Sequence, residues 1–221
     1  MNETIVQDYG TLDKKIKEPI VHGIFPVPIL FKELDRSFTK DELAFVKKSG
    51  KDTYNNMGNI TSNNVYILDT PEFAGLKKDL LAVVQYYFDK VMMADPKRVQ
   101  PYITQSWLNF TEKGQFHHKH QHPNSIVSGV LYFDADIKND KLHFYKEGYQ
   151  QLTTIATDFN HFNSTSWWFP VGTGMVTLFP SSTTHMVEVK QGTNRRTSLA
   201  FNTFIKGTFG EKAALTELLN L

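Results

Sequence analysis

Residues 116–133 read FHHKHQHPNSIVSGVLYF, and this stretch decides how the fold is interpreted. Four of the chain's eight histidines lie within six residues here, at His117, His118, His120 and His122, and an apolar segment follows them. In an extended segment, side chains at positions i and i+2 point to the same face, about 6–7 Å apart. His120 and His122 could therefore bind one metal ion, with His118 one step behind.

A third metal ligand must come from elsewhere, and the best candidate is His185, which follows a Phe-Pro-Ser-Ser turn and begins another predicted strand.

Arg196 lies on the next predicted strand. One face of that strand carries Arg196 with small or polar neighbours, namely Ser198, Ala200 and Asn202. The opposite face carries Leu199, Phe201 and Thr203. An arginine on such a face suggests a bidentate clamp for a carboxylate. Arg195, on the other face, is better suited to an ion pair.

Imidazole alone does not identify the metal, because Fe(II), Mn(II), Zn(II) and Cu(II) all accept it. The simplest alternative is a polar loop that happens to be rich in histidine. Against this, His122 directly precedes Pro123, which favours extended geometry in the preceding residue. The strand that follows leads into the predicted core.

Composition narrows the remaining possibilities. The 221 residues favour one domain, and 24 basic against 23 acidic residues give no basic surplus for a nucleic-acid or anionic-membrane partner. Without cysteine, disulfides and thiolate sites are excluded, so nitrogen and oxygen must hold any metal. Residues 1–19 do not resemble a signal peptide, and no stretch approaches the ~20 apolar residues that span a bilayer. We therefore expect a soluble protein in the cytoplasm.

The first 100 residues are expected to frame the domain. Residues 1–23 are predicted to form an arm and residues 24–221 a single domain. The segment 23–31, GIFPVPILF, contains two prolines and is typical of an edge strand. Such an edge could either block or mediate pairing between copies of the chain. Residues 55–64 are rich in Asn and Gly and predict a loop.

Two helices are predicted before the β-rich region. Thr39 and Glu42 form a capping-box pattern ahead of an apolar run. Thr70 and Pro71 suit the N-cap and first position of a second helix. The apolar residues of that helix recur with a period near 3.6 until Asp95, so one stripe should lie on a sheet.

From Tyr102 onward the apolar pattern changes to a period of two. It predicts eight strands: Ile103–Phe110, Ile126–Phe133, Leu142–Tyr145, Gln151–Ala156, Ser166–Phe169, Met175–Phe179, His185–Lys190 and Thr197–Ile205. Eight strands at this spacing indicate a barrel or a two-sheet jelly roll. We expect the polar connection Asp158–Thr165 to form part of a rim, and residues 211–221 to form a short amphipathic helix or a frayed end. Trp107, Trp167 and Trp168 could line a pocket, although packing on the sheet is the ordinary role for at least two of them.

The order of His120-x-His122, His185 and Arg196 resembles the 2-oxoglutarate- and Fe(II)-dependent oxygenases. The similarity is closer to a bacterial and phage branch with the pattern HxHPxS…SGVxY…FPS…H…R…FN, and it covers about residues 24–206. The further matching segments are Phe25–Pro28, Trp107–Asn109, Ser128–Tyr132 and Phe179–Ser181.

This resemblance implies a double-stranded β-helix, a cupin-like jelly roll whose open mouth holds iron. Carried over, His120 and His185 are Fe(II) ligands, and His122 stands where the family has an acidic ligand. Arg196 would bind the far carboxylate of 2-oxoglutarate. The implied reaction is the hydroxylation of a C–H bond, with release of succinate and CO2.

The resemblance also implies supporting roles for three polar residues. Tyr132 could donate its hydroxyl to the same carboxylate, and Asn109 or Asn202 could orient metal ligands. Each of the three fits the role of an ordinary core hydrogen-bonding group equally well.

His122 leaves three interpretations open: it binds the metal, it does not, or His118 and His120 form the pair instead. Two other functions also stay open. One is a cupin-like three-histidine metal protein that does not use 2-oxoglutarate, and the other is a non-catalytic jelly-roll binding or structural module. The sequence does not choose between a small molecule and a protein side chain as substrate.

Overall fold

The computed structural model describes residues 21, 23–148 and 155–220. Its elements, in chain order, are β1 (Leu30–Glu33), α1 (Lys40–Ser49), β2 (Thr53–Asn55), β3 (Ile60–Ser62), two 3₁₀ turns (Ile67–Asp69 and Pro71–Phe73), α2 (Ala74–Lys90), β4 (Val99–Thr111), β5 (His117–His120), β6 (Val127–Asp134), β7 (Lys141–Tyr145), β8 (Ser166–Pro170), β9 (Met175–Pro180), β10 (His185–Val187) and β11 (Arg196–Gly207).

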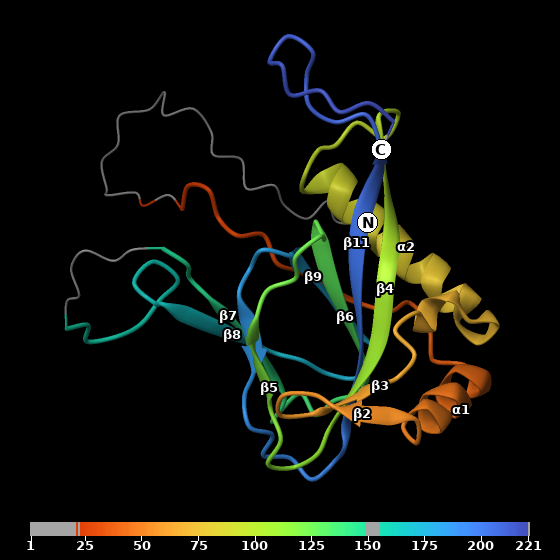
Figure 1. Ribbon diagram of the computed structural model, residues 1–221. Coiled ribbons are helices and arrows are strands. Elements are labelled where there is room, and N and C mark those ends of the chain that lie inside the picture. Colours follow the sequence, from red (N-terminus) through yellow and green to blue (C-terminus); the bar gives the residue numbers. More distant parts are fainter. Residues whose placement is uncertain (1–20, 22, 149–154, 221) are drawn as a thin grey trace.

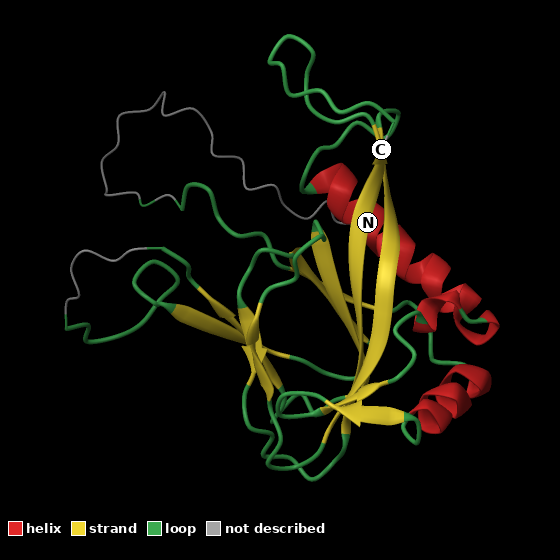
Figure 2. Ribbon diagram, viewed as in Figure 1, coloured by secondary structure: helices red, strands yellow, loops and turns green. Residues whose placement is uncertain are grey.

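The strands form two antiparallel sheets. The larger has the order β1-β9-β6-β11-β4-β3-β2 and the smaller the order β5-β10-β7-β8. Figure 1 shows α1 and α2 on the outer face of the larger sheet, with the smaller sheet on its other side. The colouring of Figure 2 makes the separation of helices and strands plain. The predicted class, mainly β with two N-terminal helices before a jelly roll, is confirmed.

Alternation along β6 of the larger sheet separates two apolar layers. In β6, Leu131 and Phe133 belong to the cluster beneath the helices, together with Leu76 and Leu80 of α2. The intervening Tyr132 belongs instead to a second cluster, between the sheets. The other buried members of this second cluster are Leu142, Phe144, Val171 and Phe179. The larger sheet is therefore covered on both faces, which fixes the register of its strands.

The predicted capping box begins α1. The Thr39 hydroxyl accepts a hydrogen bond from the Glu42 backbone nitrogen at 3.1 Å, and the Thr39 nitrogen donates to the Glu42 carboxylate at 2.8 Å. Arg36 contacts both Glu42 and Asp79 at 2.7 Å, so one guanidinium ties α1 to α2. None of the helices in the described residues is long and apolar enough to cross a membrane.

Helix boundaries differ from the prediction in three places. Thr70 and Pro71 begin a 3₁₀ turn, because the Thr70 hydroxyl donates to the Ile67 carbonyl at 2.8 Å and caps nothing. The α-helix starts at Ala74 and ends at Lys90, ahead of Asp95. The described part of residues 211–221 forms turns and no helix, since residues 209 and 218 pair as an isolated bridge.

Strand predictions were wrong at several boundaries. Residues 55–64 contain β3 and the end of β2, because Ile60 pairs with β4 and extends the sheet. The edge strand β1 begins only at Leu30, beyond the second proline, and pairs with β9 at the edge of the sheet. Of the predicted strand 151–156, residues 151–154 lie outside the described residues and the other two are not in a strand. The predicted arm 1–23 also lies outside them, apart from residues 21 and 23. Residues 158–165 form the expected loop.

Candidate metal centre

The smaller sheet brings two of the predicted ligands together. His185 of β10 stands opposite His120 of β5 in the ladder, and their ring centroids lie 4.4 Å apart. His122 follows β5 and is held by its backbone nitrogen, which donates to the Ser181 carbonyl at 3.0 Å. Its ring lies 4.8 Å from that of His120 and 5.1 Å from that of His185. One nitrogen from each of these three residues, the inner triad, lies within 4.8 Å of the others.

Backbone carbonyls fix which ring nitrogen is available in two members of the inner triad. Nδ1 of His120 lies 2.7 Å from the His118 carbonyl, and Nδ1 of His185 lies 2.9 Å from the Thr183 carbonyl. A carbonyl oxygen only accepts, so each Nδ1 carries the hydrogen and each Nε2 keeps its lone pair. Metal-binding histidines are commonly oriented by such a second bond.

Burial keeps the inner triad neutral. It lowers the pKa of His185 to about 3 and that of His122 to about 4, and the neighbouring His120 adds to both shifts. Burial also lowers the pKa of His120, although its bond to the His118 carbonyl opposes the shift. Neutral imidazoles bind a metal without first losing a proton, so the three residues fit a divalent ion.

The donor set contains imidazole nitrogen only. No Asp or Glu joins the inner triad among the residues that the structure describes. Asp134 instead accepts a hydrogen bond from Asn194 at 2.8 Å, and Asp136 accepts one from Asn139 at 2.6 Å, in the turn before β7. Metal–imidazole bonds of about 2.1 Å place adjacent nitrogens about 3 Å apart, so ion binding would draw the three rings closer together.

Arg196 is buried at the start of β11, on the same face as Ser198, as the alternation predicted. Its Nη2 donates to the Thr111 hydroxyl at 3.0 Å, and its Nη1 lies 3.7 Å from the Asp140 carboxylate. Arg195 makes the expected ion pair, with Glu112 at 2.9 Å. The strand pattern did not predict the acidic neighbour of Arg196.

Lys190 is a second buried cation in contact with Asp140. Lys190 Nζ donates to both oxygens of Asp140, at 3.0 and 3.1 Å, and to the side-chain oxygen of Asn194 at 2.9 Å. Lys190 and Asp140 are both buried, with side-chain exposures of 0% and 1%. With Arg196 they form a cluster of two cations and one carboxylate. Neither residue lies in a recognisable motif, so the sequence carried no signal for this cluster.

Tyr132 reaches the same region from β6. Burial raises the pKa of its hydroxyl above the usual range, and the nearby Asp140 adds to the shift while Arg196 opposes it. The hydroxyl therefore stays protonated and can donate a hydrogen bond.

The two asparagines differ in their surroundings. The side-chain oxygen of Asn109 accepts from Asn59 at 3.3 Å and from Thr61 at 3.1 Å, which are core contacts with β3 and its turn. Asn202 accepts from the Ser128 hydroxyl at 2.8 Å, and Ser128 bonds the Ser181 hydroxyl at 2.8 Å. Because Ser181 holds the backbone of His122, only Asn202 is linked to the inner triad by these bonds.

A cavity of about 260 Å³ lies beside the histidines. It is lined by residues of β2, β3, β4 and β5 and their loops, namely Tyr54, Asn56, Thr61, Val65, Gln105, Trp107, His117, His118, His120 and His122. The Trp107 ring lies 5.8 Å from that of His122. Trp168 packs under Lys141 at 3.8 Å and Trp167 against His161, so one tryptophan of the three faces the cavity.

Part of the chain, which includes the metal centre, matches a known protein family. Residues 105–202 match the family described as "Putative 2OG-Fe(II) oxygenase". The matched region contains the inner triad and Arg196, and it supports the superfamily indicated by the motifs. The narrower bacterial and phage branch stays a prediction. No curated protein sequence matches the chain.

Solved structures share the fold at low identity. The α-ketoglutarate-dependent epimerase SnoN from nogalamycin biosynthesis is 10% identical, with a TM-score of 0.59 over 82% of this chain and 79% of that one. HygX from Streptomyces hygroscopicus, with nickel, 2-oxoglutarate and hygromycin B bound, is 13% identical, with a TM-score of 0.54 over 80% and 82%. A prolyl-4-hydroxylase from Pseudomonas putida is 11% identical, with a TM-score of 0.51 over 80% and 92%. These similarities establish the jelly-roll fold.

Proposed function

We propose that the protein is an Fe(II)- and 2-oxoglutarate-dependent dioxygenase that hydroxylates its substrate and releases succinate and CO2. The observation that carries the proposal is the inner triad, in which His120 and His185 present fixed Nε2 lone pairs from paired strands. The family match over residues 105–202 supports the same activity.

In this proposal His120, His122 and His185 hold the iron, and Arg196 binds the far carboxylate of 2-oxoglutarate. Thr111 orients the guanidinium through its 3.0 Å hydrogen bond. The Asp140 carboxylate lies closer to Lys190, at 3.0 Å, than to Arg196, at 3.7 Å. Its negative charge is therefore compensated mainly by Lys190, and the guanidinium of Arg196 can bind an anionic ligand. Bound iron and 2-oxoglutarate would supply the oxygen activation and the oxidising equivalents.

Two further residues take supporting roles. The Tyr132 hydroxyl, kept protonated by burial, donates to the same carboxylate as Arg196. Asn202 positions the loop of His122 through Ser128 and Ser181. Asn109 is proposed only as a core residue that stabilises β3 against β4, because its oxygen already accepts two hydrogen bonds.

The cavity beside the triad is where the substrate would enter. Apart from the histidines, its lining carries no side chain with a formal charge. HygX holds hygromycin B in its structure, and a prolyl hydroxylase from Trichoplax adhaerens is in complex with a peptide fragment of hypoxia inducible factor, so proteins of this fold bind both kinds of ligand. We propose a small molecule or a protein side chain for this protein too.

The test is an anaerobic titration with Fe(II) and then 2-oxoglutarate, followed by visible spectroscopy. A metal-to-ligand charge-transfer band is expected in the wild type, absent in His185→Ala and weakened in Arg196→Ala. His161→Ala is the matched control, because His161 packs against Trp167 outside the triad, and it should give the wild-type band. Iron binding without any band in the wild type would overturn the proposal.

A second candidate is a three-histidine metal enzyme that does not use 2-oxoglutarate. It is favoured by one observation, the 3.7 Å approach of Arg196 to Asp140, which gives the arginine an acidic partner within the protein. In that case Arg196→Ala would leave metal-dependent behaviour unchanged, and the charge-transfer band would be missing.

A further inference from the structure

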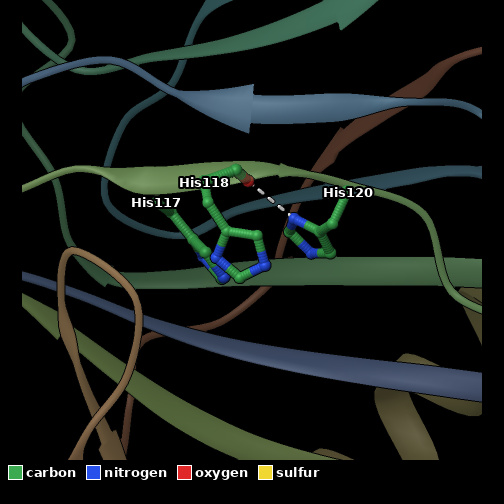
Figure 3. Close-up of side chains that lie close together, drawn as sticks. All are labelled: His117, His118 and His120. Atoms are coloured by element: carbon green, nitrogen blue, oxygen red, sulfur yellow. Dashed lines mark hydrogen bonds between the residues drawn. The ribbon is translucent and has the colours of Figure 1, made fainter.

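Three imidazoles next to the inner triad form a second group. One nitrogen each from His117, His118 and His120 lies within 4.8 Å of the others. The ring centroids of His117 and His120 are 4.6 Å apart, and those of His118 and His120 are 4.8 Å apart. Figure 3 shows the three rings gathered on one side of β5.

An irregularity in the ladder creates this arrangement. His185 pairs with His120, and Val187 pairs with His117, so two steps along β10 match three steps along β5. The extra residue in β5 is a β-bulge, which breaks the alternation of side chains and re-aims them. In a regular strand, His117 and His118 would point to opposite faces. The bulge instead brings both rings to the ring of His120.

The second group has an unsatisfied nitrogen. His118 Nδ1 is buried and has no hydrogen-bond partner within the described part of the protein. A buried polar nitrogen without a partner is costly, and a metal ion would satisfy its lone pair. All three residues line the cavity of about 260 Å³, together with His122, whereas His185 is buried and does not line it. The whole of this second group is therefore open to an ion in the cavity, whereas one ligand of the inner triad is not.

We propose that His117, His118 and His120 form an outer divalent-cation site that competes with the inner triad for one ion. The competition follows from His120, which belongs to both groups. Its Nδ1 hydrogen is committed to the His118 carbonyl, so only Nε2 can bind a metal, and it can bind one ion at a time. Full occupancy of one site removes a ligand from the other.

The donor set defines the chemistry of the outer site. Three imidazoles with open positions for water suit borderline ions such as Co(II), Ni(II) and Zn(II). The outer site lacks the carbonyl-oriented ring of His185, so it should bind roughly 10–100-fold more weakly than the inner triad. It is an alternative position for the ion, and it does not depend on the use of 2-oxoglutarate.

The test measures Co(II) binding by calorimetry and by the visible d–d spectrum under anaerobic conditions. Wild-type protein should bind one tight ion. The variant His122→Ala/His185→Ala keeps only the outer group and should still bind one ion, more weakly and with a different spectrum. Adding His117→Ala and His118→Ala to that variant should abolish the remaining binding.

The reverse variant, His117→Ala/His118→Ala, keeps only the inner triad and should bind one tight ion. Thermal melting checks that each variant is folded, and His161→Ala serves as the control for losing a histidine elsewhere. The proposal is wrong if His122→Ala/His185→Ala binds Co(II) no better than the fourfold variant. Two equally tight ions in the wild type would also refute the competition.

This outcome is separable from that of the proposed function. The charge-transfer band reports 2-oxoglutarate at the inner triad, whereas Co(II) binding by His122→Ala/His185→Ala reports the outer group alone. A band without outer-site binding would leave the dioxygenase proposal standing and overturn this one.

Discussion

Replacing Lys190 by methionine tests the buried charge cluster behind the proposed cosubstrate site. The substitution keeps the length and apolar volume of the side chain but removes the ammonium that donates to both oxygens of Asp140. Asp140 then keeps Arg196, 3.7 Å away, as its cationic neighbour, together with a backbone bond from Asp136 at 2.8 Å. In the variant, the buried carboxylate of Asp140 therefore loses its closest positive charge.

The magnitude follows from the burial of both partners. Breaking a buried ion pair by removing one member typically costs 3–5 kcal/mol, because the other charge stays desolvated. Arg196 offsets part of that cost, so we expect a loss of about 3 kcal/mol in the free energy of unfolding. For a chain of this size, such a loss lowers Tm by roughly 6–12 °C.

Urea unfolding followed by circular dichroism measures this loss, and Lys138→Met is the matched control. Lys138 lies in the same turn as Asp140 but is exposed, so its replacement should change stability by less than about 0.5 kcal/mol. The double variant Lys190→Met/Asp140→Asn should be more stable than Lys190→Met, because no unpaired carboxylate remains. A loss below about 1 kcal/mol in Lys190→Met, or no recovery in the double variant, would refute the reasoning.

The same variant should weaken binding of 2-oxoglutarate. Without Lys190, the Asp140 carboxylate turns towards Arg196 and competes with the cosubstrate for the guanidinium. We expect a higher Kd for 2-oxoglutarate in Lys190→Met and an unchanged Kd in Lys138→Met. An unchanged Kd in both would mean that Asp140 does not govern the charge available at Arg196.

Three further predictions concern the helices, the sheet and the metal. Burial alone would raise the pKa of Glu42, but hydrogen bonds from Arg36 and Thr39 outweigh it and the pKa is lowered. The stabilisation by Glu42 is therefore present above its ordinary value of 4.5 and is lost as pH falls through the lower folded value. Glu42→Gln should cost about 2 kcal/mol at pH 7 and flatten the loss of stability below about pH 4.5, measured by urea unfolding across pH. Gly129→Ala should cost about 2 kcal/mol, because its Cβ would lie 2.7 Å from Leu178 Cδ2 and clash with the Phe201 ring. Gly75→Ala, with nothing within 4 Å, should stabilise α2 by up to about 1 kcal/mol in the same assay. Fe(II) or Co(II) at 100 times its Kd should stabilise the protein by about 2.7 kcal/mol, and a chelator should reverse the rise in Tm. His120→Ala, which damages both histidine groups, should abolish the metal-dependent rise.

Much of the fold could be predicted because alternation and capping are local signals. In β11, the face that carries Arg196 and the small residues and the face that carries Leu199 lie on opposite sides of the larger sheet, as the alternation predicted. The i, i+2 spacing likewise placed His120 and His122 together, and their rings lie 4.8 Å apart. These predictions depended only on the geometry of an extended chain.

The remaining features depend on contacts between distant segments. The pairing of Lys190 with Asp140 joins positions 50 residues apart and leaves no periodic trace. The bulge in β5 depends on the register with β10, so the sequence could not show that His117 and His118 share a side. The hairpin of β2 and β3 reads as a polar loop, because its pairing with the edge of β4 decides its structure.

Charge favours the proposed dioxygenase over the second candidate function. A set of three neutral imidazoles leaves a divalent ion with one more positive charge than two histidines and a carboxylate would. The cluster of Lys190, Arg196 and Asp140 adds one net positive charge in the interior, two cations less one carboxylate. Both regions should therefore attract an anion, and under the proposed function the two carboxylates of 2-oxoglutarate would each interact with one region. A ligand with a single anionic group would interact with one region only, so we expect a dicarboxylate to bind this interior more tightly than a monoanion does.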